Sequence, residues 1–453
     1  MDLLAAARAM AGRLAGDNLG FCGVSTDSRT IAAGELFLAL RGENFDGHHY
    51  VAAAQARGAV AAVVAADAAV GLHLLGLPLI EVAETRLALG ALAADWRSRF
   101  TLPVIAVTGS NGKTTTKEMI AAILRRQYGD TVLATRGNLN NEIGLPLTLL
   151  GLAAGQRAAV IEMGMNQPGE IAYLTQIGAP TVAVVTNAQR AHLAGMGDMN
   201  QIAREKGSIF AGLGAGGVAV VNADDAYAGL WRRMAGRNPL LTFGIERGAD
   251  VRAVVRQQGL TTLLSLWTPV GQAELKLAVP GRHNARNALA AAAACLAAGI
   301  PLAAVVAGLE GFAGLKGRLQ RRQGRAGAVV LDDTYNANPD SVRAGIDVLA
   351  ATIGRKVLVL GDMGEIGEAS GQYHDEIGGY AKSQGVDRLL AFGDASQQAV
   401  RNFGEGARHF CDIEKLIAAV NKQLGPETTV LVKGSRFMKM ERVADAIVGE
   451  EKN

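Results

Sequence analysis

The sequence is poor in cysteine and has almost no net charge, and each shortage excludes a class of protein. Its 453 residues include three cysteines, Cys22, Cys295 and Cys411, which lie far apart and form no Cys-x-x-Cys pair. Such a sparse, odd set predicts reduced thiols in a cytoplasmic protein, not a disulfide framework. A formal charge of +3 gives no reason to expect nucleic acid as a partner.

The sequence pattern predicts neither a signal peptide nor an uninterrupted membrane span. Asp2 stands where a signal peptide carries positive charge, and Arg8 and Arg13 interrupt the apolar run that follows. Residues 288–309 carry no charge over a length that would cross a bilayer. They are mostly alanine, however, and Gly299-Ile300-Pro301 breaks them, which predicts two short buried helices joined by a turn. We therefore expect no integral membrane segment. We also expect the protein to be a monomer.

Length and pattern predict three α/β domains. A chain of this size suggests about three domains, and 49% hydrophobic residues predict an extensive core. There are no low-complexity tails and no repeats of 20 to 50 residues. The predicted units are a small α/β domain (1–83), a central P-loop-type ATPase domain with a mostly parallel sheet (84–313) and a Rossmann-like domain (314–453).

A glycine-rich turn between a strand and a helix dominates the central unit. The apolar run 104–107 precedes Thr108-Gly109-Ser110-Asn111-Gly112-Lys113-Thr114-Thr115, and apolar residues recur at helical spacing after it. In such a turn, backbone N–H groups surround phosphate oxygens, a lysine reaches the terminal phosphates and a hydroxyl can ligate Mg²⁺. Two residues separate the glycines here, where an ordinary P-loop has four. A chance Gly-Lys-Thr at a helix start is the alternative.

Polar residues follow several predicted buried strands. The central strand candidates are 103–107, 158–161, 181–185, 217–221 and 239–243, and residues 244–280 look like an antiparallel patch. Glu162, Asn187 and Asn222 come where strands end, which in a doubly wound sheet is where ligands bind. In the last unit, strand candidates 329–331, 357–360, 389–392 and 430–432 also end in polar residues.

These residues limit the reactions that the protein could catalyse but do not identify one. Glu162 should lie beside the phosphate loop and can ligate Mg²⁺, unless it is a buried structural carboxylate. Taken alone, His192 and Lys206 are more often ordinary structural or solvated residues. A second domain facing a nucleotide suggests transfer to a bound acceptor, with closure excluding water. An amide ligase, a phosphotransferase and a nucleotide-switch protein all remain open at this point.

Several motifs together resemble the Mur ligase family over essentially the whole chain. The phosphate loop marks the family, and the motifs that carry the resemblance are residues 25–29, 108–118, 137–144, 162–165, 191–193, 281–284 with Asn287, 333–339 and 361–365. The Glu162–Met165 and Asp333–Pro339 segments point to the member that adds D-alanyl-D-alanine to UDP-N-acetylmuramoyl-tripeptide. The related ligase that adds the diamino acid typically carries an Asp-Asn-Pro-Arg motif, which this chain lacks.

The resemblance implies an ATP-dependent ligase of peptidoglycan precursor synthesis. ATP would phosphorylate the tripeptide's carboxylate, and the dipeptide amine would attack the resulting acyl phosphate. The three domains would bind the UDP end, ATP and the incoming dipeptide, in that order. A related Mur ligase adding the diamino acid, or a P-loop phosphotransferase, is the alternative.

The resemblance also assigns residues, motif by motif. ATP would be held by Thr108, Gly109, Ser110, Asn111, Gly112, Lys113, Thr114 and Thr115, with Asn287 at the adenine, Asp333 at the ribose and Arg318 at the γ-phosphate. Two Mg²⁺ ions are expected, one on Thr114 and Glu162, the other on His192 and a carbamylated Lys206. The UDP end would meet Ser28, Asn44 and His48, and the muramoyl-peptide part Asn138, Asn140 and Asn141. The dipeptide would meet Tyr335, Asn336, Asn338, Ser435 and Arg436.

Overall fold

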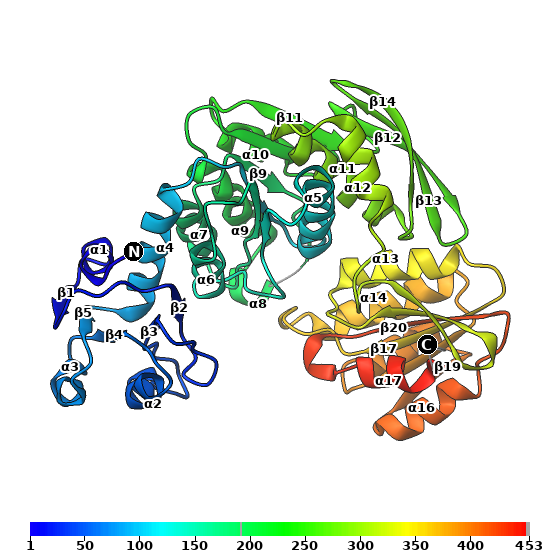
Figure 1. Ribbon diagram of the computed structural model, residues 1–453. Helices are drawn as coiled ribbons and strands as arrows, with labels where there is room; N and C mark the ends of the chain where they lie inside the picture. The colour runs from blue at the N-terminus through cyan, green and yellow to red at the C-terminus, as the bar shows by residue number, and fades with distance from the viewer. Residues whose placement is uncertain (191–192, 450–453) are drawn as a thin grey trace.

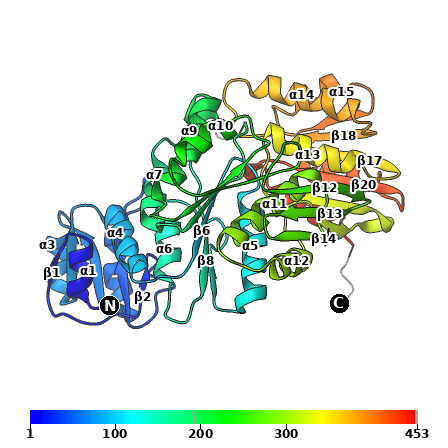
Figure 2. The ribbon, with the colours of Figure 1, turned by 90° about the horizontal axis from the view of Figure 1, so that it is seen from above.

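Three lobes follow one another along the chain, and each is built around one β-sheet. The computed structural model describes residues 1–190 and 193–449. The first lobe stands apart at one end, and the other two lie next to each other (Figure 1). Seen from above, the antiparallel end of the central sheet lies beside the third lobe (Figure 2).

The first lobe has a five-stranded sheet in the order β1-β5-β4-β3-β2. β1 is antiparallel to β5, and the other pairs are parallel. Apolar residues of α1 and α4 pack on one face and those of α2 and α3 on the other. The strands are β1 (Arg13–Ala15), β2 (Gly23–Ser25), β3 (Glu35–Leu38), β4 (Ala61–Ala65) and β5 (Leu79–Val82), and the helices are α1 (Leu3–Ala9), α2 (Val51–Ala56), α3 (Ala69–Leu72) and α4 (Thr85–Ser98).

The central lobe has a nine-stranded sheet in the order β14-β13-β12-β11-β10-β9-β6-β8-β7. Its parallel strands are continuous apolar runs because helices cover both faces. The strands are β6 (Val104–Thr108), β7 (Val132–Ala134), β8 (Ala158–Glu162), β9 (Val182–Val185), β10 (Val218–Asn222), β11 (Leu240–Gly244), β12 (Val251–Gln258), β13 (Thr261–Thr268) and β14 (Gly271–Leu277). β12, β13 and β14 form an antiparallel extension, as expected for residues 244–280.

The phosphate loop leads into a helix on one face of this sheet. That face is covered by α5 (Lys113–Tyr128), α11 (Arg282–Ala297) and α12 (Leu302–Glu310). The opposite face is covered by α6 (Gly144–Leu150), α7 (Glu170–Gly178), α9 (Met199–Gly207) and α10 (Ala228–Met234), with α8 (Leu193–Met196) nearby in the chain.

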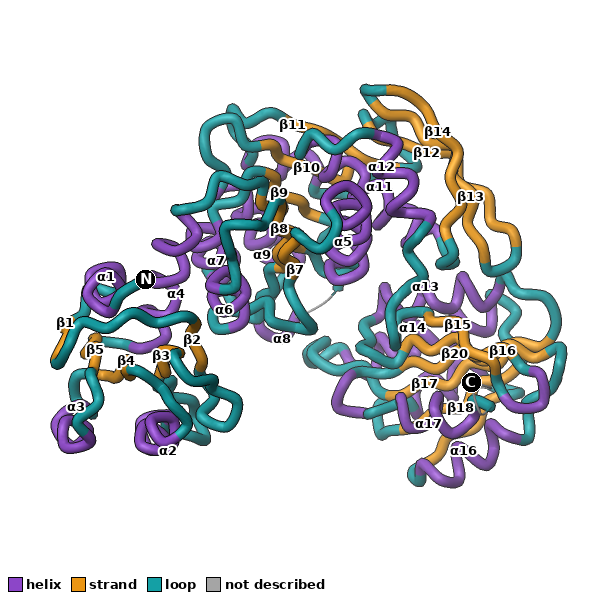
Figure 3. The backbone as a smooth tube through the Cα atoms, viewed as in Figure 1, coloured by secondary structure: helices purple, strands orange, loops and turns teal. Residues whose placement is uncertain are grey.

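The third lobe has a six-stranded sheet in the order β15-β16-β20-β17-β18-β19, in which β15 alone is antiparallel to its neighbour. α13, α14 and α15 cover one face, and α16 and α17 the other (Figure 3). The strands are β15 (Gln320–Gln323), β16 (Val329–Asp333), β17 (Arg355–Gly361), β18 (Arg388–Phe392), β19 (Ala407–Phe410) and β20 (Thr428–Lys433). The helices are α13 (Pro339–Ala350), α14 (Ser370–Ser383), α15 (Gln397–Phe403), α16 (Ile413–Asn421) and α17 (Glu441–Ile447).

The predicted fold class is confirmed, and every strand predicted from an apolar run is present. Residues 288–309 form the end of α11 and most of α12, separated by a turn at Gly299, and no described helix is long and apolar enough to cross a membrane. In the central and third lobes the prediction missed the short strands β7, β15 and β19, and it assigned no strand bounds in the first lobe. The domain boundaries at 83 and 313 stay predictions, since α4 packs both on α1 and on α6 and α7 of the central lobe.

One glycine sets how closely α12 approaches α5, the helix that begins at the phosphate loop. A Cβ atom at Gly308 would lie 2.4 Å from the Ile123 Cα atom and 2.8 Å from its backbone nitrogen. No side chain can move aside here, because the conflict is with backbone. The absence of a side chain therefore fixes the packing of these two helices.

We predict that Gly308→Ala destabilises the protein by about 1–3 kcal/mol, because α12 must move away from α5. The measurement is the midpoint of heat unfolding by scanning calorimetry. Gly229→Ala in α10 is the matched control, since the nearest atom to its Cβ would be 3.7 Å away. Equal midpoints for Gly308→Ala and the unmodified protein would show that the helices separate without cost.

Candidate active site

The phosphate loop leaves the carboxyl end of β6, between β8 and β9, and leads directly into α5. Two of its positions exclude any side chain. A Cβ at Gly109, where φ is +149°, would lie 1.8 Å from the Thr186 Oγ1 atom, and one at Gly112, where φ is +80°, would lie 2.2 Å from the Asn287 Oδ1 atom. Backbone therefore lines this turn, which is what close approach to phosphate oxygens requires.

The tip of the loop is bound to the segment that follows β9. The Thr186 hydroxyl donates to the Asn111 carbonyl over 2.8 Å, and the Asn111 N–H donates to the Asn187 side chain over 2.9 Å. Ser110 donates its hydroxyl to the Gln189 carbonyl, and the Gln189 N–H donates back to that hydroxyl. Residues 186–189 and the loop tip thus form one hydrogen-bonded unit.

Lys113 lies inside this loop. Its Nζ atom donates to the carbonyl oxygens of Gly109, at 2.7 Å, and Ser110, at 3.3 Å. Burial lowers the pKa of Lys113, the Arg318 charge lowers it further, and Glu162 and Glu365 oppose the shift. A partly buried cation in a loop of backbone N–H groups is suited to an anionic ligand.

Glu162 ends β8 next to the loop, as predicted. Its Oε1 atom accepts a hydrogen bond from Asn140 over 2.7 Å, while its Oε2 atom is buried and, within the described part of the chain, has no hydrogen-bond partner. A buried carboxylate oxygen rarely lacks a partner. Together with the nearby Thr114 hydroxyl, this free oxygen fits a hard cation such as Mg²⁺.

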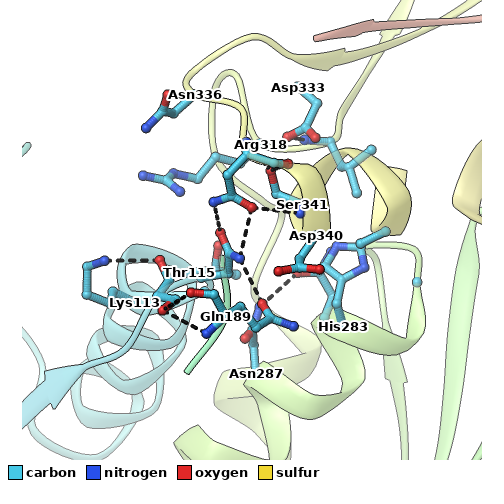
Figure 4. A pocket seen from close by; sticks show the side chains of 18 of the residues that line it. Lys113, Thr115, Gln189, His283, Asn287, Arg318, Asp333, Asn336, Asp340 and Ser341 are labelled. Atoms are coloured by element: carbon cyan, nitrogen blue, oxygen red, sulfur yellow. Dashed lines mark hydrogen bonds between the residues drawn. The ribbon is translucent and has the colours of Figure 1, made fainter. Parts of the chain in front are cut away.

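A cavity of about 860 Å³ opens between the loop and the third lobe (Figure 4). Fifteen of the predicted site residues line it: Ser110, Asn111, Gly112, Lys113, Thr114, Thr115, Asn138, Asn140, Glu162, Asn287, Arg318, Asp333, Tyr335, Asn336 and Asn338. They come from segments more than two hundred positions apart, so the fold brings together what the motifs had suggested separately.

Arg318 lies between the two lobes and joins the third to the phosphate loop. Its Nη2 atom donates to the Thr114 hydroxyl over 3.0 Å, and its guanidinium stacks 4.0 Å from the centre of the Tyr335 ring. Behind it, the Lys433 Nζ atom lies 2.6 Å from the Asp333 Oδ2 atom. The ribose role predicted for Asp333 stays a prediction, and this ion pair holds its carboxylate in place.

Asn287 lies on α11 below the loop, on the side of the cavity away from Arg318 (Figure 4). His283, one turn earlier, also lines the cavity, and burial lowers its pKa to about 4, so the imidazole is neutral at physiological pH. Gln257 and Phe243 also line this part of the cavity, as do Arg282 and Arg286 of the same helix. The neutral and apolar groups among them suit a heteroaromatic base.

Lys206 on α9 does not line the cavity, although it lies near enough for its charge to interact with that of Lys113. Its side chain is 1% exposed, and burial holds its pKa well below the usual range, with Lys113 acting in the same direction and Glu205 opposing. Glu205 itself accepts hydrogen bonds from the Gly169 and Ile171 N–H groups. The other predicted second-metal residue, His192, lies outside the described residues.

The predicted first-lobe residues are not part of the cavity. His48 is buried, accepts a hydrogen bond from the Ala65 N–H over 2.9 Å and pairs with Asp46 through its other nitrogen. Both ring nitrogens are therefore occupied by the fold. Asn44 is exposed and Ser28 half-buried, so contact with a UDP end stays a prediction for both.

Five other predicted residues also lie off the cavity. Thr108 and Gly109 begin the loop but do not line the cavity, and the Asn141 side chain accepts from the Gly144 N–H at the start of α6. The buried Ser435 donates to the Ala337 carbonyl and accepts from the Gly364 N–H. Arg436 is exposed and pairs with Glu441 at 3.2 Å. A direct dipeptide contact for these last two stays a prediction without support from their orientation.

Sequence reasoning missed Glu365. It lines the cavity from the loop after β17, has a left-handed backbone with φ +60°, and its charge raises the pKa of Lys113. A left-handed glutamate is uncommon and marks a position held by its surroundings. The signal was present in Gly361–Glu365, which ends a predicted strand with two acidic residues.

Three family models match successive parts of the chain. They are the Mur ligase family, catalytic domain over residues 21–97, the Mur ligase middle domain over 107–295, and the Mur ligase, glutamate ligase domain over 317–436. Their order agrees with the three lobes.

Named relatives and solved structures match over nearly the whole length. The UDP-N-acetylmuramoyl-tripeptide–D-alanyl-D-alanine ligase of Escherichia coli is 41% identical, with 96% of each chain covered, and that of Bacillus subtilis is 34% identical, with 94% and 93% covered. A crystal structure of MurF from Acinetobacter baumannii is similar with a TM-score of 0.90, 37% identity and 97% of each chain covered. MurF ligase from Thermotoga maritima in complex with ADP gives a TM-score of 0.81 at 26% identity, over 94% and 96%. Since identity well above 30% extends over almost the whole chain, this protein belongs to the Mur ligase family.

Proposed function

We propose that this protein is an ATP-dependent amide ligase that adds D-alanyl-D-alanine to UDP-N-acetylmuramoyl-tripeptide, in cytoplasmic peptidoglycan precursor synthesis. The observation that carries the proposal is one cavity walled on one side by a phosphate loop and on the other by a separate lobe. Full-length relatives named for this reaction support it. A phosphotransferase would need no acceptor lobe of this size.

The chemistry joins a carboxylate to an amine at the expense of one phosphoanhydride bond. A carboxylate oxygen of the tripeptide attacks the γ-phosphorus of ATP, and ADP leaves. The dipeptide's amine nitrogen then attacks the carbonyl carbon of the acyl phosphate and loses a proton. The C–O bond to phosphate breaks, so the products are the amide, ADP and phosphate.

Each stage carries negative charge, and the cations of the cavity are placed to neutralise it. Lys113 and Arg318 approach the loop from the central and third lobes respectively. Their charges act where phosphate oxygens would lie, in a partly enclosed site where such interactions are strong. Thr114 and the free oxygen of Glu162 would hold one Mg²⁺, which supplies further positive charge at the transferred phosphoryl group.

The remaining residues are assigned to parts of the substrates by the wall of the cavity on which they lie. Asn287 and His283 would contact the adenine, and Asp333 the ribose. Asn138 and Asn140 would contact the muramoyl-peptide part, with the first lobe holding the UDP end. Tyr335, Asn336 and Asn338 would meet the dipeptide from the third lobe. All of them except the first-lobe residues line the same cavity.

We predict that phosphate release from ATP and Mg²⁺ requires both UDP-N-acetylmuramoyl-tripeptide and D-alanyl-D-alanine. The measurement is phosphate release with each substrate omitted in turn, with the product identified by its mass, which should equal the sum of the two substrates less water. Release that is indifferent to the dipeptide would instead support a phosphotransferase or a nucleotide switch.

We predict that Lys113→Ala lowers ligation by at least a hundredfold, because the transferred phosphoryl group loses its loop cation. Turnover should be compared with that of Lys382→Ala, which removes a lysine from an exposed surface of α14. Unfolding midpoints of both variants should match that of the unmodified protein. Near-normal turnover in Lys113→Ala would refute the role of the loop in phosphate binding.

Carbamylation of Lys206 stays a prediction, and the chemistry of its surroundings is compatible with it. A lowered pKa favours the neutral amine, the form that adds to carbon dioxide, and a carbamate offers oxygens that a bare ammonium lacks. We predict that Lys206→Ala loses most ligation and that added bicarbonate does not restore it.

Enrichment with ¹³C-labelled bicarbonate should give a carbamate carbon resonance in the unmodified protein and none in Lys206→Ala. If the resonance is absent from both while Lys206→Ala is inactive, the lysine acts without carbamylation. Unchanged turnover in the variant removes Lys206 from the site altogether.

A further inference from the structure

Arg190 connects the central lobe to the third lobe through two carboxylates. Its Nη2 atom lies 2.7 Å from the Asp340 Oδ1 atom, and its Nη1 atom lies 2.9 Å from the Glu376 Oε2 atom. Its backbone N–H also donates to Asp340 over 2.8 Å, and its guanidinium lies 5.2 Å from the centre of the Tyr373 ring.

The partners of Arg190 belong to α13 and α14 of the third lobe, and α13 lines the cavity. Asp340 is in the first turn of α13, two residues after Asn338, which caps that helix. Asn338 in turn exchanges hydrogen bonds with Asn111 at the tip of the phosphate loop, at 2.8 and 3.2 Å. The first turn of α13 is therefore attached to the central lobe at two points.

Both points belong to the same hydrogen-bonded unit of the central lobe. Asn111 is in the loop tip, and Arg190 directly follows the segment 186–189 that holds this tip. These contacts fix the position of α13 relative to the phosphate loop. They also fix the position of Arg318, which comes from the third lobe's side of the cavity and donates to Thr114.

The geometry points to Arg190 as a positioning residue: we propose that its paired contacts with Asp340 and Glu376 dock the third lobe so that Arg318 and the dipeptide-binding wall face the phosphate loop. The proposal rests on the proposed ligase function for what is docked, but the docking itself does not depend on the identity of the substrates. Arg190 touches no reacting atom in this scheme.

The exposure of these groups suits a reversible contact. The side chains of Arg190, Asp340 and Glu376 are 25%, 21% and 32% exposed. Water and ions reach such pairs, so the contact can break without leaving a buried charge, and salt weakens it. An arginine fork on two carboxylates is nevertheless stronger and more directional than a single surface pair. The covalent connection between the lobes is the segment 311–317, which contains no helix or strand.

The first test measures docking without substrates, by small-angle X-ray scattering of the full chain. Arg190→Ala and Arg190→Glu should increase the radius of gyration in that order, because the first removes the attraction and the second places like charges together. In the unmodified protein, the radius should rise between 0.05 and 0.5 M NaCl, and in Arg190→Ala it should not. The matched control is Arg99→Ala, which removes an arginine that pairs with Asp95 at 2.7 Å and stacks on Trp96 within α4.

The second test separates docking from chemistry. A lobe that is docked for a smaller fraction of the time binds its ligands more weakly by that fraction. Arg190→Ala should therefore raise the KM for the dipeptide about tenfold, lower kcat at saturation by less than threefold, and leave the KM for the UDP-linked substrate unchanged. Arg190→Lys should recover part of the loss. In a double-mutant cycle, Arg190→Ala and Glu376→Gln should be non-additive.

Three results would overturn the proposal. One is a radius of gyration and a dipeptide KM that both stay within the range of Arg99→Ala. Another is a fall in kcat with unchanged KM and scattering, which would place Arg190 in the chemistry. The third is full additivity with Glu376→Gln. If the unmodified protein does not use the dipeptide at all, the proposed function fails, while the scattering test still decides whether Arg190 docks the lobe.

Discussion

The hydrogen bonds between the phosphate loop and the segment after β9 are the constraint on which the rest of the site depends. β6 and β9 are neighbouring parallel strands, so their carboxyl ends deliver Gly109–Gly112 and Thr186–Gln189 to the same place. The loop has no side-chain volume at its two glycines, and its shape is set by these partners instead. Glu162 arrives from β8 on the other side of β6, which makes the geometry a direct result of strand order.

Protein groups compensate the charges at this point of the cavity only in part. Lys206 is buried and Lys113 partly buried, and burial lowers the pKa of both. The Lys113 charge lowers the pKa of Lys206 further, and Glu162 has a carboxylate oxygen without a partner in the described chain. Burying such groups costs free energy unless they are compensated. Phosphate oxygens and a divalent cation would compensate both signs at once. Under the proposed function, these groups would be in place to neutralise the transition state before the substrates bind.

Much of this was predictable from the sequence, and the exceptions share a cause. Continuous apolar runs reveal buried parallel strands, and a glycine-rich turn between strand and helix reveals the loop. β7, β15 and β19 have three or four residues, too few for a clear pattern. The motifs do not show that the His48 and Ser435 side chains also bond to backbone groups, and substrate contact stays a prediction for both. Burial and orientation are properties of the folded chain, and motif spacing does not contain them.

Arg190 shows the same limit at longer range, and it bears on how a three-lobed ligase is assembled. Its partners are 150 and 186 positions away, and although Arg190 directly precedes the 191–193 motif, the sequence does not show which residues it pairs with. Each lobe can place its own residues through its own sheet, because strand ends converge locally. Holding two lobes in a fixed position relative to each other requires contacts between their surfaces. Those contacts must also be weak enough to open for substrate entry, so partly exposed ion pairs suit the task better than an apolar interface would.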